Sequence, residues 1–405
     1  MSSKEKQVLI PEYMKQFSCI GAECEDTCCN GWTINIDKNT YKKYRKLSPQ
    51  KIKTDIEKSI KRNKNNSSEG YYAEFVKSHR GCPLQSEEGW CRVHSELGES
   101  YLSNTCSIFP RMYNNFDGTI EMGGSLACPE ITRLALLNPG GIDFELTMME
   151  DNSRNHGKHN INPNNEKHKL FWEIRSFAIF IIQDRRYSIE NRLINLGMWI
   201  NKLSSIIVQK DLNALLLNIE EYKLSLNNSE LENSLNNIKP NYKLNMKISI
   251  ELLEFRKLLN IQNDRYIRLL SDITEGLNLE VNSDNNFDEL IPMINENYYL
   301  PYMQGREYIL ENYLVNDIFI NCFSHDTETL FEQYNLMVLK YALIKLHLYG
   351  VAAKYKELND DLVVNAIQAF SKCIEHNSLY LNSILELVIK QQWNSLAHMA
   401  ILIKG

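Results

Sequence analysis

Cysteine is the residue whose distribution in this sequence most clearly points to chemistry. Eight of the ten cysteines fall within the first 128 residues, and only Cys322 and Cys373 follow. Thiolates are soft ligands that suit zinc or iron–sulfur centres, and four of them complete either kind of site. The amino-terminal cluster therefore predicts a metal centre, whose candidate ligands are Cys19, Cys24, Cys28, Cys29, Cys82, Cys91, Cys106 and Cys128.

The spacing of these cysteines leaves the metal open between iron–sulfur and zinc. The C-x2-C pairs that are usual in zinc sites are missing, while Cys82 and Cys128 each precede proline, as does the last cysteine of a bacterial ferredoxin run. One four-iron cluster needs four thiolates, so about half of the eight serve otherwise or a second centre exists. Because successive side chains diverge, Cys28 and Cys29 should not both bind one cluster, so Cys19, Cys24 and one of these two supply three sulfurs. One of Cys82, Cys91, Cys106 or Cys128 supplies the fourth, and we favour Cys128, which precedes a proline.

Several polar residues near the cysteines have two interpretations each. His79 and His94 lie three residues from a cysteine. They are either ligands or, as we favour, surface or supporting residues, because the thiolates already suffice. The acidic pair Glu25–Asp26 either binds a cationic substrate beside the metal or forms a solvated turn. Arg111 either contacts a cluster or a carboxylate, or makes a structural salt bridge, so no residue here receives a catalytic role.

The elements that position these residues divide the chain in two. The part up to about Gly141 is rich in turns, with an exposed loop at Asn63–Gly70, and it contains all the clustered cysteines. Asp151–His168 is almost devoid of apolar residues and is interpreted as a linker. We therefore predict a mainly α fold, in which a small irregular cysteine-rich metal-binding domain (1–150) is followed, after the linker (151–168), by an all-helical domain (169–405).

Apolar residues recur at three- and four-residue spacing from about Lys169 onward, as in amphipathic helices. Thr329 and Glu332 have the spacing of a capping box, and Gly350 stands where the helix that follows them would end. Cys322 and Cys373 are expected inside helices, on apolar faces far from the cysteine cluster. The helical segments expected are 170–181, 193–207, 248–259, 308–323, 330–349, 361–376, 378–390 and 393–403.

Composition and missing motifs exclude several functions. The net charge of −6 argues against a nucleic-acid binder, which needs a basic face. The longest apolar run, Phe177–Ile182, is far shorter than the about 20 residues that span a bilayer, and the polar start does not resemble a signal peptide. We therefore expect a cytoplasmic protein with reduced thiols and no membrane contact. No G-x-G-x-x-G motif indicates a Rossmann-type site, and Gly31 interrupts a radical-type C-x3-C-x2-C motif.

Segments throughout the chain resemble the flagellin lysine-N-methylase family. The cysteine signature is specific, although a broader class of zinc- or iron-chelating domains shares part of it. The matching segments are Phe17-Ser-Cys-Ile-Gly-Ala-Glu-Cys-Glu-Asp-Thr-Cys-Cys-Asn-Gly-Trp-Thr-Ile-Asn-Ile-Asp37, Thr40–Tyr44, Gly81-Cys-Pro-Leu84, Trp90-Cys-Arg-Val-His94, Glu96-Leu-Gly-Glu99, Thr105-Cys106, Phe109-Pro-Arg111, Cys128-Pro-Glu-x-x-Arg133, Leu310-Glu-Asn-Tyr-Leu314 and Ile367–Asn377.

This resemblance implies an enzyme that transfers methyl groups from S-adenosylmethionine to the ε-amines of surface lysines on flagellin. It also implies a [4Fe–4S] cluster, which favours iron over zinc. Glu25, Asp26 and Glu130 match family positions near the cluster but receive no catalytic role. We expect the helical region to bind flagellin while the amino-terminal region performs the chemistry. Two alternatives stay open: an iron–sulfur protein that transfers electrons, and a zinc-stapled protein-interaction module.

Overall fold

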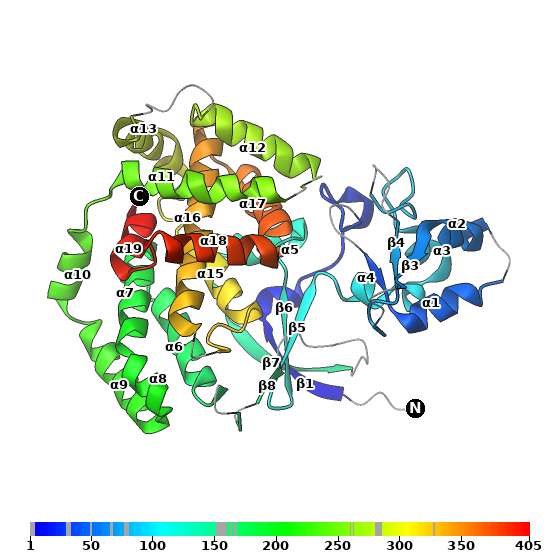
Figure 1. Cartoon of the computed structure of the whole chain (residues 1–405), viewed down its shortest axis with the longest axis horizontal. Helices are drawn as coiled ribbons and strands as arrows, with labels where there is room; N and C mark the ends of the chain where they lie inside the picture. The colour runs from blue at the N-terminus through cyan, green and yellow to red at the C-terminus, as the bar shows by residue number, and fades with distance from the viewer. Residues whose placement is uncertain are drawn as a thin grey trace.

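Helices make up most of the structure, which confirms the mainly α prediction, but two β-sheets are built from amino-terminal segments (Figure 1). The computed structural model describes residues 5–29, 34–48, 51–64, 68–76, 81–150, 160–162, 164–165, 168–259, 261, 263–279, 286–326 and 329–405. The amino-terminal region is therefore more regular than predicted, because its short strands pair across long stretches of sequence.

The larger sheet joins the start of the chain to segments more than a hundred residues away. In this sheet β1 (Glu5–Pro11) pairs antiparallel with β7 (Phe144–Glu150) and parallel with β6 (Thr119–Gly124). β5 (Arg111–Phe116) pairs antiparallel with β6, and β8 (Asn160–Ile161) completes the order β7-β1-β6-β5-β8. This mixed sheet differs from the doubly wound parallel sheet that carries a Rossmann-type site.

A small lobe, residues 34–106, carries a hydrophobic core of its own (Figure 1). Buried Ile36, Tyr44, Ile56 and Phe75 fill this core, and the strands of its sheet follow the order β2-β4-β3. We call the rest of the described chain the main body. The elements of the small lobe are β2 (Asn35–Ile36), α1 (Lys38–Arg45), α2 (Lys51–Ser59), β3 (Ile60–Arg62), β4 (Ala73–Phe75), α3 (Arg92–Leu97), η3 (Glu99–Tyr101) and the start of α4 (Asn104–Ile108).

Many helices of the main body begin at a residue whose side chain accepts a backbone N–H of the first turn, which satisfies a donor that would otherwise lack a partner. Such caps include Ser188, Asn263 and Asn377. The helical elements are η1 (Glu12–Lys15), η2 (Gly21–Glu23), α5 (Pro129–Leu136), α6 (Phe171–Ile182), α7 (Ile189–Lys202), α8 (Ser204–Gln209), α9 (Leu212–Ser225), α10 (Ser229–Asn236), α11 (Tyr242–Glu254), η5 (Phe255–Leu258), α12 (Asp264–Gly276), α13 (Phe287–Ile294), η6 (Asn295–Tyr299), α14 (Leu300–Met303), α15 (Tyr308–Ile320), α16 (Leu330–Tyr355), α17 (Asp360–Phe370), η8 (Ser371–Glu375), α18 (Ser378–Lys390) and α19 (Leu396–Lys404).

Helix α16 runs through the main body and is buried along most of its length. It is long and apolar enough to cross a membrane, but 94% of its most apolar stretch is buried inside the protein, as in a core helix. Its predicted start is right, although Thr329 precedes it without a side-chain cap. Its predicted end at Gly350 is wrong, because the helix continues to Tyr355. A Cβ at Gly350 would lie 2.8 Å from the Cα of Ile273 on α12, so this glycine allows two helices to approach closely.

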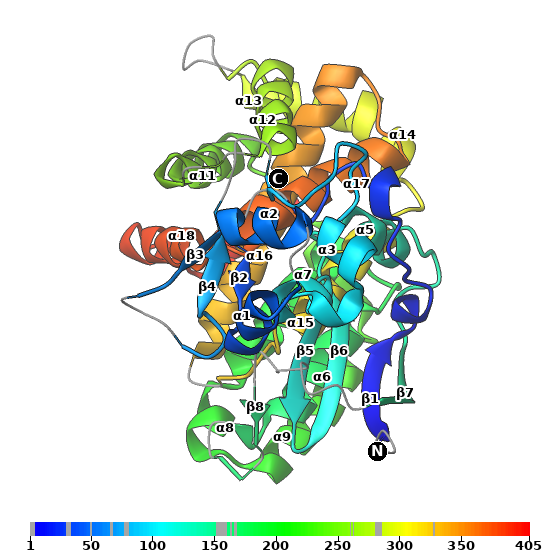
Figure 2. The ribbon, with the colours of Figure 1, turned by 90° about the vertical axis from the view of Figure 1, so that its right-hand side faces the viewer.

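One hydrophobic core joins residues from both sides of the predicted linker. It contains Val8 and Tyr113 of the larger sheet together with Phe177 of α6 and Leu339 of α16. Helix α15 packs against both β6 and α5 (Figure 2). Most of the linker, including residues 151–159, lies outside the described residues, so the division of the chain at this point stays a prediction.

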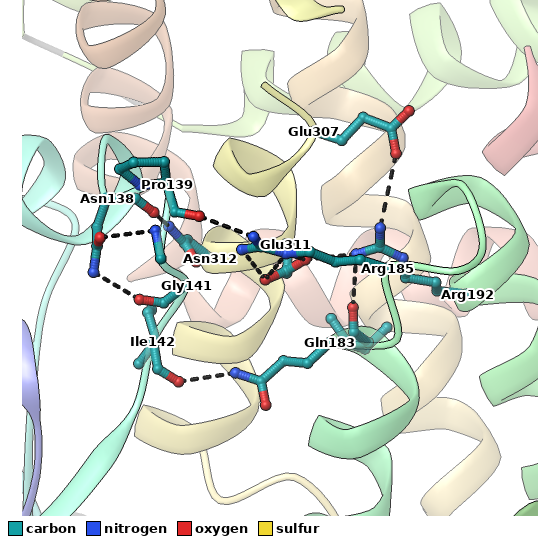
Figure 3. Close-up of polar contacts among 12 residues, drawn as sticks. Asn138, Pro139, Gly141, Ile142, Gln183, Arg185, Arg192, Glu307, Glu311 and Asn312 are labelled. Atoms are coloured by element: carbon teal, nitrogen blue, oxygen red, sulfur yellow. Dashed lines mark hydrogen bonds and ion pairs between the residues drawn. The ribbon is translucent and has the colours of Figure 1, made fainter. Parts of the chain in front are cut away.

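A buried carboxylate fastens the loop after α5 to the helices (Figure 3). The side chain of Glu311 on α15 accepts hydrogen bonds from Arg185 Nε at 2.9 Å and from Arg192 Nη1 at 2.6 Å. Arg185 also donates to the carbonyl oxygen of Pro139 at 2.9 Å. A carboxylate removed from water is costly unless it is paired, and Glu311 is only 1% exposed. The two arginines therefore make this family-matching glutamate a structural residue.

Candidate functional site

Cys29 lies at the centre of a group of thiols contributed by two loops. The backbone N–H of Cys82 donates to the carbonyl oxygen of Cys29 at 2.9 Å. The thiols of Cys28 and Cys82 both hydrogen-bond to the sulfur of Cys29, and these bonds lower the pKa of Cys29 to about 3. The same bonds, together with burial, raise the pKa values of Cys28 and Cys82. The sulfur of Cys29 is thus already favoured as the thiolate that a metal requires.

Cys91 and Cys106 belong to the small lobe, as does Cys82. All three pack against the small-lobe core. Burial raises the pKa of Cys106 to about 12, and the neighbouring Cys91 and Cys29 contribute to the rise by charge repulsion. Cys91 is the N-cap of α3, and burial raises the pKa of its thiol, while the backbone of Val93 and His94 in the first turn of that helix partly offsets the rise. Four of the predicted ligands are therefore neighbours here: Cys29, Cys82, Cys91 and Cys106.

Three other cysteines, Cys19, Cys24 and Cys128, lie toward the main body. Cys128 is the N-cap of α5, and Pro129 takes the first helical position, where its missing N–H costs nothing. Burial raises the pKa of Cys128 to about 11, and the charges of Cys24 and Cys19 raise it further. Cys28 lies between the cysteines around Cys29 and those around Cys19. The charges of Cys106, from the first group, and of Cys19, from the second, both contribute to the raised pKa of Cys28.

The chemistry of this donor set fits a thiolate-bound metal centre. Backbone N–H groups already point at the sulfurs of Cys24, Cys82 and Cys128, and such hydrogen bonds stabilise thiolates. Among the described residues, however, no group of three or more His, Cys, Asp or Glu side chains converges as a ligand set. The described structure therefore gathers cysteine sulfurs that could bind a metal in one region, but it does not arrange them as a complete set of ligands around one point.

The acidic pair between the cysteines contacts the carboxy-terminal helices. Asp26 is buried, and its Oδ1 lies 2.7 Å from the Nζ of Lys372. Its Oδ2 accepts a hydrogen bond of 2.8 Å from Gln368 on α17. Glu25 forms ion pairs with Arg133 of α5 and, at 3.8 Å, with Arg265 of α12. Asp26 is therefore buried and paired rather than solvated, whereas Glu25 is exposed and forms ion pairs at the surface.

The other polar residues singled out near the cysteines are two histidines, an arginine and a glutamate. His94 is exposed on α3, as favoured. His79 and Gly31 lie outside the described residues. The guanidinium of Arg111 lies over the ring of Phe17, 5.3 Å from its centroid. Glu130 accepts from Arg133 at 3.2 Å, which places it in the same group of charges as Glu25.

The two remaining cysteines differ from their prediction. Cys322 is fully buried beside Ile161 and Phe171, but it follows α15 in a turn with a φ of 49° rather than lying inside a helix. Cys373 belongs to η8, a single π-helical turn. It directly follows Lys372, which contacts Asp26, so Cys373 is nearer to the cysteine loop (residues 24–29) than predicted.

Sequence reasoning missed Lys372 and Gln368, the residues that join the carboxy-terminal helices to the cysteines. The one available signal was the resemblance over Ile367–Asn377, which contains both residues. Neither helix period nor residue type indicates a contact with Asp26, because the pairs are more than 340 positions apart. A single π-helical turn, here η8, is rare and frequent at functional sites.

Comparison with known proteins identifies similar sequences over almost the whole chain. Residues 175–402 match the FliB lysine N-methylase C-terminal domain. The chain is 26% identical over 392 residues to "Lysine-N-methylase" of Salmonella typhimurium and of Salmonella choleraesuis, covering 93% of this chain and 93% of each relative. It is 38% identical over 136 residues to "Flagellar biosynthetic protein FliU" of Salmonella muenchen, covering 34% of this chain and 80% of FliU. No solved structure matches.

Proposed function

This chain belongs to the FliB lysine N-methylase family, and from that premise we propose that it methylates lysine side chains of flagellin. The observation that carries the proposal is the similarity to proteins named lysine-N-methylase over 93% of the chain. The similarity to FliU, which is named as a flagellar biosynthetic protein, supports a flagellar substrate. The family makes the protein a methyltransferase; flagellin as substrate and S-adenosylmethionine as donor are the proposed specifics.

The cofactor in this proposal is a [4Fe–4S] cluster bound by amino-terminal thiolates. The residues that would hold it are Cys19, Cys24, either Cys28 or Cys29, and Cys128. Cys19 is a neighbour of Cys24, Cys28 and Cys128, and Cys29 is the sulfur whose pKa is lowered. When bound, such a cluster would supply one-electron chemistry and a site for polar ligands. The chain's own residues hold the cysteine loop against α5, α12 and α17 through Glu25 and Asp26. Thiols in a reducing compartment such as the cytoplasm stay available for metal.

Flagellin lysines carry a positive charge at neutral pH and accept a methyl group only after losing a proton. Near the cysteines, Glu25, Asp26 and Glu130 are already paired with arginine or lysine. Because these carboxylates are paired within the protein, they are not available to bind the ammonium group of a substrate lysine. We propose that the carboxy-terminal helices contribute the flagellin-binding surface, since they make up most of the described main body outside the larger sheet.

The proposed function is tested with anaerobically purified full-length protein. Incubation with flagellin and S-adenosylmethionine should add methyl groups to flagellin lysines, detected by mass spectrometry, and the protein should contain about four irons per chain. Protein treated with a chelator, and reactions without the donor, are the controls. Stoichiometric zinc without iron, or no methylation by iron-loaded protein, contradicts the proposal.

A further inference from the structure

We propose that Lys372 and Gln368 are positioning residues that hold the cysteine loop, residues 24–29, against the carboxy-terminal helices through the carboxylate of Asp26. Lys372 Nζ lies 2.7 Å from Asp26 Oδ1, and Gln368 Nε2 donates to Asp26 Oδ2 at 2.8 Å. Where it concerns the cluster, this inference rests on the proposed function. The positioning itself rests on the contacts alone.

The two side chains hold both chain segments that carry the proposed ligands. Lys372 also donates to the carbonyl oxygen of Thr27 at 3.0 Å, and Gln368 donates to the carbonyl oxygen of Ala127 at 2.9 Å. Thr27 precedes Cys28, and Ala127 precedes Cys128. One turn of helix therefore fixes the distance between two loops that are about a hundred residues apart in sequence.

Burial makes these contacts specific. The side chains of Lys372 and Asp26 are 5% and 7% exposed, and Gln368 is fully buried. A buried charge is tolerated only when it is paired and hydrogen-bonded. The four contacts therefore select one position of the loop, because a shift would leave a lysine and a carboxylate in the interior without partners.

The π-helical turn η8 explains how the two residues reach the loop. The turn inserts an extra residue after α17. Lys372 then faces Asp26, whereas Glu375 of the same turn accepts the hydroxyl of Tyr313 on α15. His376 lies with its Nε2 2.9 Å from the hydroxyl of Ser125. The turn is thus fixed to the main body on one side and to the cysteine segments on the other.

Lys372 also brings a positive charge next to the thiols. Its ammonium group lies 3.0 Å from the carbonyl oxygen of Thr27, the residue that immediately precedes Cys28. Net charge and hydrogen bonds around a cluster set its reduction potential. Loss of the charge should make the bound cluster harder to reduce, whereas an uncharged change in the same contacts should not.

The test uses anaerobic full-length protein and four variants: Lys372→Met, Lys372→Arg, Gln368→Leu and, as a control, Lys223→Met, which breaks an exposed pair with Glu220. Hydrogen exchange of residues 24–29 and 125–128 is measured together with iron content, reduction potential and the free energy of unfolding. In Lys372→Met and Gln368→Leu, we expect exchange at least about tenfold faster in these two segments alone. The potential should fall only in Lys372→Met, and Lys372→Arg should restore it.

Unchanged exchange in both Lys372→Met and Gln368→Leu overturns the proposal. Faster exchange over the whole main body also overturns it, because the residues would then be merely structural. If the unmodified protein holds no iron, the cofactor part of the proposed function fails, while the exchange measurement still decides the positioning role. Equal potentials in Lys372→Met and Gln368→Leu would refute the electrostatic part.

Discussion

Arg175 and Glu121 form a two-point ion pair that joins the first helix of the carboxy-terminal region to the larger sheet. Arg175 Nη1 donates to Glu121 Oε2 at 2.7 Å, and Nη2 donates to the other carboxylate oxygen. The side chains are 3% and 2% exposed. The guanidinium also lies 4.6 Å from the ring centroid of Phe171 and 5.4 Å from that of Phe319. This ion pair therefore joins β6 to α6, and both of its side chains are shielded from water.

Replacement of Arg175 by methionine should strongly destabilise the protein, because it leaves the Glu121 carboxylate buried without a partner. We expect a loss of about 3–5 kcal/mol in the free energy of unfolding, measured by urea denaturation. The double variant Arg175→Met/Glu121→Leu should lose much less, since no charge then stays buried. The exposed pair of Lys223 and Glu220 is the control, where Lys223→Met should cost at most about 1 kcal/mol. Similar losses in Arg175→Met and Lys223→Met would show that the buried pair has no special role.

Serine at Cys128 should remove most of the iron from anaerobically purified protein. A hydroxyl is a poor replacement for a thiolate at a soft metal centre, and Cys128 is the member of the proposed set that comes from the start of α5 rather than from residues 19–29. Iron and acid-labile sulfide per chain are the measurement. Cys322→Ser is the matched control, because Cys322 is buried in a separate small cluster with Ile161 and Phe171. Full iron content in Cys128→Ser would exclude this cysteine as a ligand.

The periodic helices could be predicted from the sequence because their apolar residues repeat locally. Segment 378–390 coincides with α18, and segment 170–181 is one residue from α6. The strands could not be predicted in this way. The buried residues of β1, which are Val8, Ile10 and Pro11, lie where this strand meets residues far along the chain, and its partners lie more than a hundred positions away. Pairing of this kind depends on tertiary contacts rather than on local propensity.

The cysteines were found as candidates because residue type and clustering are visible in sequence. The sequence does not reveal that some of these cysteines are neighbours of Cys29 and others neighbours of Cys19, because this division depends on how the small lobe meets the main body. Asp26 shows the same limit. Beside cysteines in sequence it resembles a solvated or substrate-binding acid, but its partner Lys372 comes from a turn 346 positions later.

Alanine at Gly350 should destabilise the protein although alanine favours helices. The added Cβ would lie 2.8 Å from both Cα and Cγ2 of Ile273, so α12 and α16 would have to move apart. Overpacking of this kind costs about 1–3 kcal/mol, beyond the about 1 kcal/mol gained in helix propensity. Thermal unfolding of Gly350→Ala is compared with Gly70→Ala, where no atom lies within 4 Å of the added methyl group. An equal or higher melting temperature in Gly350→Ala would contradict close packing at this crossing.

The stability of the protein should fall in mildly acidic solution because of His347 on α16. Burial lowers the pKa of this histidine from 6.5 to about 4, and its ring nitrogens lie 2.6 Å from the carbonyl oxygen of Leu343 and 3.2 Å from the hydroxyl of Tyr266. In the unfolded chain the same ring binds a proton at about pH 6.5. The unfolded state therefore binds more protons between pH 6.5 and 4, and stability decreases as the pH falls through that window.

A shift of this size corresponds to roughly 3 kcal/mol between pH 7 and pH 4. Urea denaturation at a series of pH values should show this loss in the unmodified protein. In His347→Gln the overall stability will be lower, but the slope of stability against pH should be smaller by the contribution of one histidine. His94→Gln is the control, because His94 is exposed on α3 and its replacement should leave the slope unchanged. If His347→Gln and the unmodified protein lose stability in parallel as the pH falls, His347 is not the group responsible.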